Sequence, residues 1–174
     1  MQFIKDREIY EKVVQELVIS AEHFVWIASA DIKDMYVKRG NGMQPFLSVL
    51  ADMIESGVSV RLIHAKEPGP NFRKDFDRYS VLAQKLERML CPRVHFKSVI
   101  VDGKAAYMGS ANLTGAGMGA KAANRRNFES DLLTKEPWLV NQIMTQFDEV
   151  WMGAHCEACA RKKFCPDCPL HADD

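Results

Sequence analysis

Apolar and polar positions alternate along the first half of the chain in patterns typical of both helices and strands. Apolar residues recur every three or four positions over residues 5–20 and 46–55, which predicts two amphipathic helices. Mostly apolar runs of strand length occupy residues 23–32 and 58–65. Glycine and proline mark the intervening segments 33–45 and 67–72 as loops.

The second half begins with another apolar stripe at helical spacing. It runs over residues 76–90 and ends before Pro92, which cannot continue a helix. Residues 111–127 are rich in glycine and alanine and show no regular period. The remaining predicted elements are strands at 94–101, 105–110 and 128–134 and a helix at 138–151.

This order of elements predicts an α/β fold, in which helices pack on a mixed β-sheet. The chain has 174 residues, of which 47% are hydrophobic, enough for one domain with a real core. We therefore predict one principal domain over residues 1–153, followed by a short cysteine-rich element over 154–174.

The charge balance limits the classes of function. The chain carries 23 basic and 23 acidic residues, so any binding to nucleic acid must come from a local basic patch. No apolar run approaches the roughly 18–20 residues of a membrane span. The charged N-terminus does not resemble a signal peptide, and we expect a cytoplasmic protein.

The most informative segment is a predicted hairpin around the Asp-Gly pair at 102–103, a strong signal for a two-residue turn. A turn at 102–103 places His95 opposite Ser110. A turn shifted by one residue places His95 opposite Asn112 and Lys97 opposite Ser110. In both registers strand alternation places the four side chains on one face of the sheet.

These four side chains suit the chemistry of a phosphate diester. Lys97 supplies positive charge, and Ser110 and Asn112 supply directed hydrogen-bond donors. A neutral His95 can attack phosphorus through one ring nitrogen, provided that a partner holds the other nitrogen in the correct tautomer.

The full spacing, HxKx4Dx6GSxN, resembles the signature of the phospholipase D superfamily at every defined position. The resemblance implies that His95 is the nucleophile and forms a phosphohistidine intermediate. It implies that Lys97 and Asn112 hold the phosphate, with Ser110 beside them. It gives Asp102 a mainly structural role.

The resemblance covers roughly residues 5–151, with its specific part at 95–129, and makes 1–153 the catalytic domain. Family members often carry an acidic residue after the motif that orients the histidine. The Asn-Phe-Glu triplet that ends at Glu129 resembles this element, so Glu129 is the candidate. The alternative is that Glu129 is a solvated charge on a strand.

The chemistry needs a second histidine, which protonates the leaving oxygen and later activates water. Most large family members carry two copies of the motif, and this chain carries one. Single-copy members solve this by homodimerising, so we expect a homodimer with both His95 side chains in one cleft. The resemblance also implies that no catalytic metal is needed. The histidines outside the motif are His23, His64, His155 and His171.

The motif does not identify the substrate, that is, the alcohol group that is released from phosphorus. Small single-motif members resemble nucleases, which favours DNA or RNA as the partner. The alternatives are phospholipid hydrolysis or transfer, and a nucleic-acid-binding module without catalysis. Basic side chains that could contact substrate, or could form a solvated surface, are Lys121, Arg125 and Arg126 after the motif and Lys33, Lys38 and Arg39 after the first strand.

Two CxxC pairs lie in the last 21 residues, at Cys156 and Cys159 and at Cys165 and Cys168. Four thiolates can surround one metal, and a structural zinc is the leading choice. The short spacing between the pairs leaves a [4Fe–4S] cluster open. The element could brace the last helix, form a dimer contact or touch nucleic acid. Cys91 stands apart and is expected to pack in the core.

Overall fold

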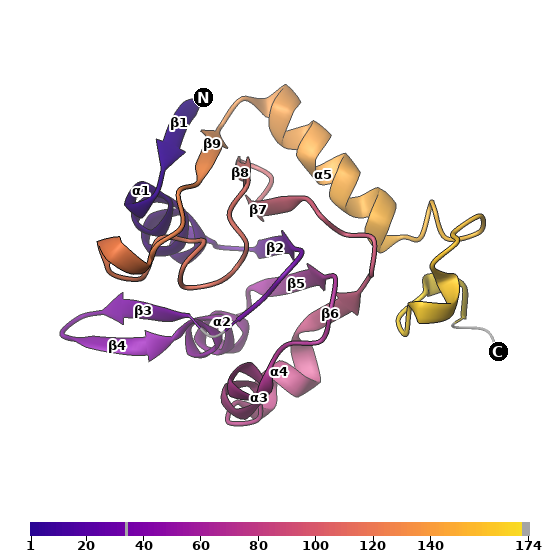
Figure 1. The fold of residues 1–174 in the computed structure, drawn as a ribbon, viewed down its shortest axis with the longest axis horizontal. Helices are drawn as coiled ribbons and strands as arrows, with labels where there is room; N and C mark the ends of the chain where they lie inside the picture. Colours follow the sequence, from indigo (N-terminus) through magenta and orange to yellow (C-terminus); the bar gives the residue numbers. More distant parts are fainter. Residues whose placement is uncertain (34, 172–174) are drawn as a thin grey trace.

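A computed structural model describes residues 1–33 and 35–171, with the side chain of residue 171 left out. Its centre is a seven-stranded mixed sheet in the order β1-β9-β8-β7-β2-β5-β6, with helices packed on it (Figure 1). The predicted α/β fold class is confirmed. The strands of the sheet are β1 (Gln2–Lys5), β2 (Phe24–Ser29), β5 (Ser59–His64), β6 (Glu87–Leu90), β7 (Lys97–Val101), β8 (Ala105–Gly109) and β9 (Ser130–Thr134).

The helices confirm most of the predicted periodic segments. The first predicted helix is continuous but changes type along its length, from α-helix to π-helix to 3₁₀ helix. No helix of the described residues is both long enough and apolar enough to cross a membrane. The helices are α1 (Arg7–Ile9), the π-helix η1 (Tyr10–Leu17), the 3₁₀ helix η2 (Val18–Ser20), α2 (Phe46–Glu55), α3 (Pro70–Phe76), α4 (Ser80–Lys85) and α5 (Pro137–Trp151), followed by short 3₁₀ turns η3 (Ala123–Arg125), η4 (Lys162–Phe164) and η5 (Pro169–His171).

Each face of the sheet has its own apolar core, because alternate strand residues point in opposite directions. In β7, Val99 and Val101 join the cluster that contains the N-terminal helices and α2. Ile100 joins the cluster on the other face, with Ile143 and Phe147 of α5. This double burial explains why β7 is buried along its whole length.

The strand registers align the ends of several strands, which together form one edge of the sheet that runs across the strands. Ser29 is the partner of His64, Lys97 is the partner of Gly109, and Gly109 is also the partner of Asp131. Polar residues of β2, β5, β7 and β9 therefore meet at this edge, although they are far apart in the sequence.

Two predictions for the middle of the chain are wrong. Residues 33–45, predicted as a loop, include the separate two-stranded sheet of β3 (Tyr36–Arg39) and β4 (Gly42–Pro45). Val37 buries its side chain there, and Tyr10 Oη accepts a hydrogen bond from the Lys38 amide at 2.8 Å. Of the helix predicted over 76–90, only α4, Ser80–Lys85, is formed as a separate helix. Phe76 is the last residue of α3, residues 77–79 are not helical, and Glu87–Leu90 form β6 along the open side of β5.

One further predicted loop is partly wrong, and one strand was not predicted at all. The loop predicted over 67–72 contains the start of α3, which begins with Pro70, a residue suited to a first helical turn. The pattern did not reveal β1, which pairs antiparallel with β9. A strand of four residues at a sheet edge carries too few buried positions to show a period: only Ile4 is buried.

The hairpin around residue 102 adopts neither of the two predicted registers. Val101 is the partner of Ala105, so the turn holds three residues, and Lys97 lies opposite Gly109. Asp102 and Gly103 both have left-handed backbones, with φ of 53° and 63°. The argument that strand alternation gathers the four motif residues is therefore wrong, because β8 ends at Gly109. Ser110 and Asn112 follow in the loop.

The Asp102 carboxylate fastens this turn to the start of β2. It accepts hydrogen bonds from the backbone amides of Glu22, His23 and Phe24, at 2.9, 2.9 and 2.8 Å. Partial burial would raise the pKa of Asp102, but the three amide donors outweigh it and hold this pKa below the ordinary value. Asp102 lies at the opposite end of β7 from Lys97, as its expected structural role requires.

We predict that Asp102→Ala lowers the free energy of unfolding by about 2 kcal/mol, because three backbone amides lose a charged acceptor. Asp102→Asn, which keeps one acceptor oxygen and tolerates the left-handed backbone, should lose less. Urea denaturation at neutral pH measures both variants. The wild-type advantage should be present at neutral pH and disappear as the pH falls through the lowered pKa of Asp102.

The control is Lys104→Ala in the same turn, where the Lys104 side chain makes an exposed ion pair with Glu22 at 3.6 Å. It should change the unfolding free energy by less than about 0.5 kcal/mol. An Asp102→Ala variant as stable as this control would contradict the anchoring role.

Candidate active site

The segment between β6 and β7 carries His95 on the surface, directly before the buried Lys97. Lys97 Nζ lies 3.3 Å from His95 Nδ1 and 2.5 Å from the His95 carbonyl oxygen. Only 7% of Lys97 is exposed, and this burial lowers its pKa, while the charge of Glu129 opposes the shift. The structure thus places an imidazole and an ammonium in contact at the common edge of the sheet.

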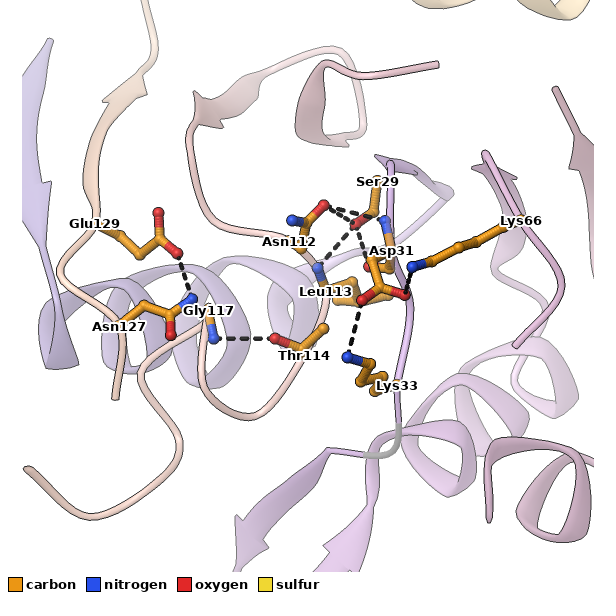
Figure 2. A network of polar contacts seen from close by, with 10 residues as sticks. All are labelled: Ser29, Asp31, Lys33, Lys66, Asn112, Leu113, Thr114, Gly117, Asn127 and Glu129. Carbon is orange, nitrogen blue, oxygen red and sulfur yellow. Dashed lines mark hydrogen bonds and ion pairs between the residues drawn. The ribbon is translucent and has the colours of Figure 1, made fainter. Parts of the chain in front are cut away.

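Ser110 and Glu129 meet next to this pair. The Ser110 hydroxyl donates to Glu129 Oε2, and Asn127 Nδ2 donates to Glu129 Oε1 at 3.0 Å. Figure 2 shows the contact between Asn127 and Glu129. Within the described part of the chain, no hydrogen bond joins Glu129 to His95. The negative charge of Glu129 favours the charged form of Lys97, and its carboxylate accepts a hydrogen bond from the Ser110 hydroxyl. Its expected role in orienting His95 stays a prediction.

Asn112 is held by the loop that follows β2 (Figure 2). Its Oδ1 accepts a hydrogen bond from the Asp31 amide at 3.1 Å and lies 3.4 Å from Ser29 Oγ. Ser29 Oγ also accepts a hydrogen bond from the Leu113 amide at 2.8 Å. These contacts fix the side-chain amide of Asn112 with Nδ2 pointing away from Ser29 and Asp31. An amide nitrogen in that position is free to donate to an anionic oxygen.

Asp131, which the sequence pattern did not single out, supports the loop that carries Ser110. Its Oδ1 accepts hydrogen bonds from the amides of Ser110 and Ala111 at 2.5 and 3.4 Å. Burial raises the pKa of Asp131, although these amide donors oppose the shift. Gly109 makes this approach possible, because a Cβ atom there would lie 1.6 Å from Asp131 Oδ1.

A cavity of about 990 Å³ opens beside Asn112, between the loops after β2, β5 and β8. Lys33, Lys66 and Lys121 line it, and the Asp31 carboxylate binds two of them, with Lys33 at 3.0 Å and Lys66 at 3.3 Å (Figure 2). Lys66 was not among the predicted contacts, because a lone lysine after a strand carries no signal of its own.

The other predicted basic contacts lie outside the lining of this cavity. Arg125 is exposed and Arg126 half-buried at the short turn η3 and directly after it. Lys38 and Arg39 lie on β3, and Arg39 makes an ion pair with Asp52 at 2.5 Å. Of the basic residues named from the sequence, the structure thus brings Lys33 and Lys121 together.

The four tail cysteines and Cys91 line a second cavity of about 250 Å³, beyond the end of α5. Their thiols are the donors that a zinc ion or an iron–sulfur cluster prefers. Within residues 1–33 and 35–171, however, no three Cys, His, Asp or Glu side chains are already gathered around one point as a single ion requires.

A family model described as cardiolipin synthase, PLD-like domain, matches residues 14–151. No curated protein sequence matches the chain.

Solved structures share the fold at low sequence identity. Nuc from Salmonella typhimurium, a phospholipase D family member, superposes with a TM-score of 0.62 at 16% identity, covering 86% of this chain and 92% of its own. NucT from Helicobacter pylori gives 0.59 at 16% identity, covering 85% and 95%. TrmBL2, an archaeal chromatin protein, gives 0.56 at 15% identity, covering 87% of this chain and 52% of its own.

The close approach of Asp131 to the backbone yields a prediction. Gly109→Ala should destabilise the protein by at least about 2 kcal/mol, because the new methyl group displaces the carboxylate that holds Ser110 and Ala111. Thermal or urea unfolding measures the loss. Gly69→Ala is the matched control, since a Cβ atom at Gly69 meets nothing within 4 Å. Equal stability of the two variants would contradict the role assigned to Gly109.

Proposed function

Because the chain belongs to the family of phospholipase D-like domains, we propose that it is a phosphodiesterase that forms a phosphohistidine on His95 and cleaves nucleic acid. The observation that carries the proposal is the placement of His95, Lys97, Ser110 and Asn112 at one edge of the sheet. This set combines a nucleophile with a positive charge and two neutral donors, as a phosphodiester requires.

In the first step a ring nitrogen of His95 attacks phosphorus. The new N–P bond forms as the P–O bond to the leaving group breaks, and a second, protonated imidazole gives its proton to the departing oxygen. In the second step a water molecule attacks phosphorus, and its proton returns to the second imidazole. The N–P bond breaks, which regenerates His95 and releases a phosphate monoester.

Lys97 would have two roles in this scheme. Without substrate its ammonium contacts His95 Nδ1, which keeps the ring proton on Nε2. A phosphate oxygen competes for the same ammonium. Once Lys97 turns to the phosphate, the ring proton can reside on Nδ1, and the lone pair of Nε2 becomes available for attack.

The second imidazole is proposed to come from a second copy of the chain. His64 is fully buried, and its Nδ1 lies 2.8 Å from the Lys66 carbonyl oxygen. His23 lies beside Asp102, at the far end of the hairpin, and His155 lies next to Glu149 at 3.6 Å, beyond α5. The side chain of His171 lies outside the described residues. Among the described histidines, a symmetry-related His95 is the best placed partner.

A nucleic-acid substrate is supported by the cavity beside Asn112. Its three lysines can follow a phosphate backbone that leaves the site, although Asp31 partly neutralises them. One protein that shares the fold, TrmBL2, is described as binding DNA in a novel mode. Phospholipid hydrolysis or transfer, and nucleic-acid binding without cleavage, are the competing outcomes of the experiment below.

We predict that the pure protein cleaves labelled DNA or RNA without added divalent metal and that His95→Ala lowers the rate at least about 1,000-fold. The variant should still bind the same substrate, since Lys97 and Asn112 remain. Parallel reactions contain single- and double-stranded DNA, RNA and phosphatidylcholine vesicles. Cleavage of the lipid alone would favour the phospholipase alternative. Binding without cleavage in the wild type would favour the non-catalytic module.

A mixing experiment tests the shared site. Wild-type and His95→Ala chains are unfolded together and refolded at several ratios, so that the subunits assort at random. If each site needs two copies of His95, the activity should fall as the square of the wild-type fraction. A linear fall would contradict the shared site while leaving the phosphohistidine mechanism intact.

A further inference from the structure

The cavity beside Asn112 contains two lysines whose backbones are anchored and whose side chains are exposed. The Lys33 amide donates a hydrogen bond to the Leu113 carbonyl oxygen at 3.0 Å. The Lys66 carbonyl oxygen accepts a hydrogen bond at 2.8 Å from Nδ1 of His64, which is fully buried. Both lysine side chains are 65% exposed. The fold therefore presents two positive charges at fixed places on the cavity wall, on side chains that can still turn.

Asp31 stands between these two lysines and Asn112. Its backbone amide donates to Asn112 Oδ1 at 3.1 Å, and its carboxylate binds Lys33 at 3.0 Å and Lys66 at 3.3 Å (Figure 2). One residue thus links the side chain proposed to hold the scissile phosphate with two ammonium groups in the cavity. An anion on Asn112 and a second anion on the lysines would be close neighbours, as successive phosphates of one nucleic-acid strand are.

The Asp31 carboxylate satisfies the lysines only in part, because it shares one negative charge between two ammonium groups. Among the described residues that line the cavity, three lysines outnumber the two carboxylates of Asp31 and Glu67. Ion pairs between exposed side chains contribute little, whereas a phosphate offers several charged acceptor oxygens. A phosphate can therefore replace Asp31 on the lysines at small cost.

An aromatic ring lies on the β3 side of the same cavity. Tyr36 is 43% exposed and contributes to the lining. A ring beside lysines suits a nucleotide, since bases stack on aromatic side chains and ammonium groups bind the phosphate. Phosphatidylcholine offers one phosphate and a cationic headgroup, which the lysines would repel. The lining of the cavity thus favours a nucleic-acid strand over this lipid.

On the basis of the function proposed for the His95 site, we propose that this cavity binds the phosphate next to the scissile one in a polynucleotide. Lys33 and Lys66 release the Asp31 carboxylate and turn to the second phosphate, while Tyr36 contacts the nucleoside between the two phosphates. The substrate class is then a strand with at least two successive phosphodiesters. A diester with a single phosphate forfeits these contacts.

Two substrates measure the contribution of the second phosphate. One is a labelled oligonucleotide of the type cleaved in the substrate screen, and the other is bis(p-nitrophenyl) phosphate, a diester without a neighbouring phosphate. Lys66→Ala should lower the ratio of kcat/KM for the oligonucleotide to kcat/KM for bis(p-nitrophenyl) phosphate at least about tenfold, chiefly through KM.

Lys12→Ala is the matched control for this ratio. Lys12 also makes an ion pair with a carboxylate, that of Glu16 at 2.9 Å, but it lies on η1 and outside the lining of this cavity. The control should leave the ratio as it is in the wild type. The same ratio in Lys66→Ala and Lys12→Ala would overturn the proposal.

Asp31→Asn distinguishes displacement of the carboxylate from a purely structural role. The variant keeps the backbone amide that holds Asn112 and removes the competing charge. Affinity for the labelled oligonucleotide is measured by fluorescence anisotropy in a His95→Ala background, where no cleavage occurs. Asp31→Asn should bind about threefold more tightly or better, and Lys66→Ala should reduce the slope of log Kd against log salt concentration by about 1. Weaker binding by Asp31→Asn would show that the carboxylate only positions the lysines, and would overturn the exchange.

These measurements separate the second-phosphate site from the catalytic proposal. If hydrolysis of bis(p-nitrophenyl) phosphate depends on His95 but Lys66→Ala behaves as the control does, the catalytic proposal stands and the second-phosphate site is wrong. If no diester is cleaved but Asp31→Asn and Lys66→Ala change oligonucleotide affinity in opposite directions, the anion site stands and the phosphohistidine mechanism is wrong. Cleavage of phosphatidylcholine vesicles in preference to the oligonucleotide would overturn the assignment of the cavity to a nucleic-acid strand.

Discussion

The pairing register between β7 and β8 is the constraint on which the rest of the site depends. A shift by one residue would turn every side chain of β7 to the opposite face, exchanging the two apolar cores and moving Lys97 away from Gly109. The left-handed turn at Asp102 and Gly103 and the carboxylate contacts of Asp102 with β2 fix this register. A turn far from His95 therefore determines where the end of the hairpin that carries Lys97 lies.

At that end the protein holds charged groups in surroundings that disfavour charge. Burial lowers the pKa of Lys97 and raises that of Asp131. Each group has a specific compensation: Lys97 has the field of Glu129 and the His95 carbonyl oxygen, and Asp131 has two backbone amides. The Lys97 ammonium would gain from the arrival of a phosphate, because an anion restores to it the interaction with charge that burial removed.

The sequence supplied the candidate residues of the site but not the geometry that gathers them. The α/β class, the strand at 59–64 and the helix at 46–55 follow from apolar periods that tertiary packing reinforces. The β6 strand was missed because its residues also fit a helical stripe. They form a strand because β5 offers backbone groups for pairing on its outer side, which the sequence pattern does not show. Asp131 and Lys66 were missed because their importance depends on neighbours that are distant in the chain.

The separate sheet of β3 and β4 has a consequence for how such a protein can change. Its Tyr36 lines the cavity beside Asn112, while the residues proposed to hold the phosphate belong to the central sheet and its loops. The β3–β4 sheet thus contributes one side of this cavity, and the loops after β2, β5 and β8 form the rest of its wall. Under the proposed function, exchange of this hairpin in evolution or by design would reshape one side of the cavity, and with it the choice of polymer or lipid, while His95, Lys97, Ser110 and Asn112 stay in place.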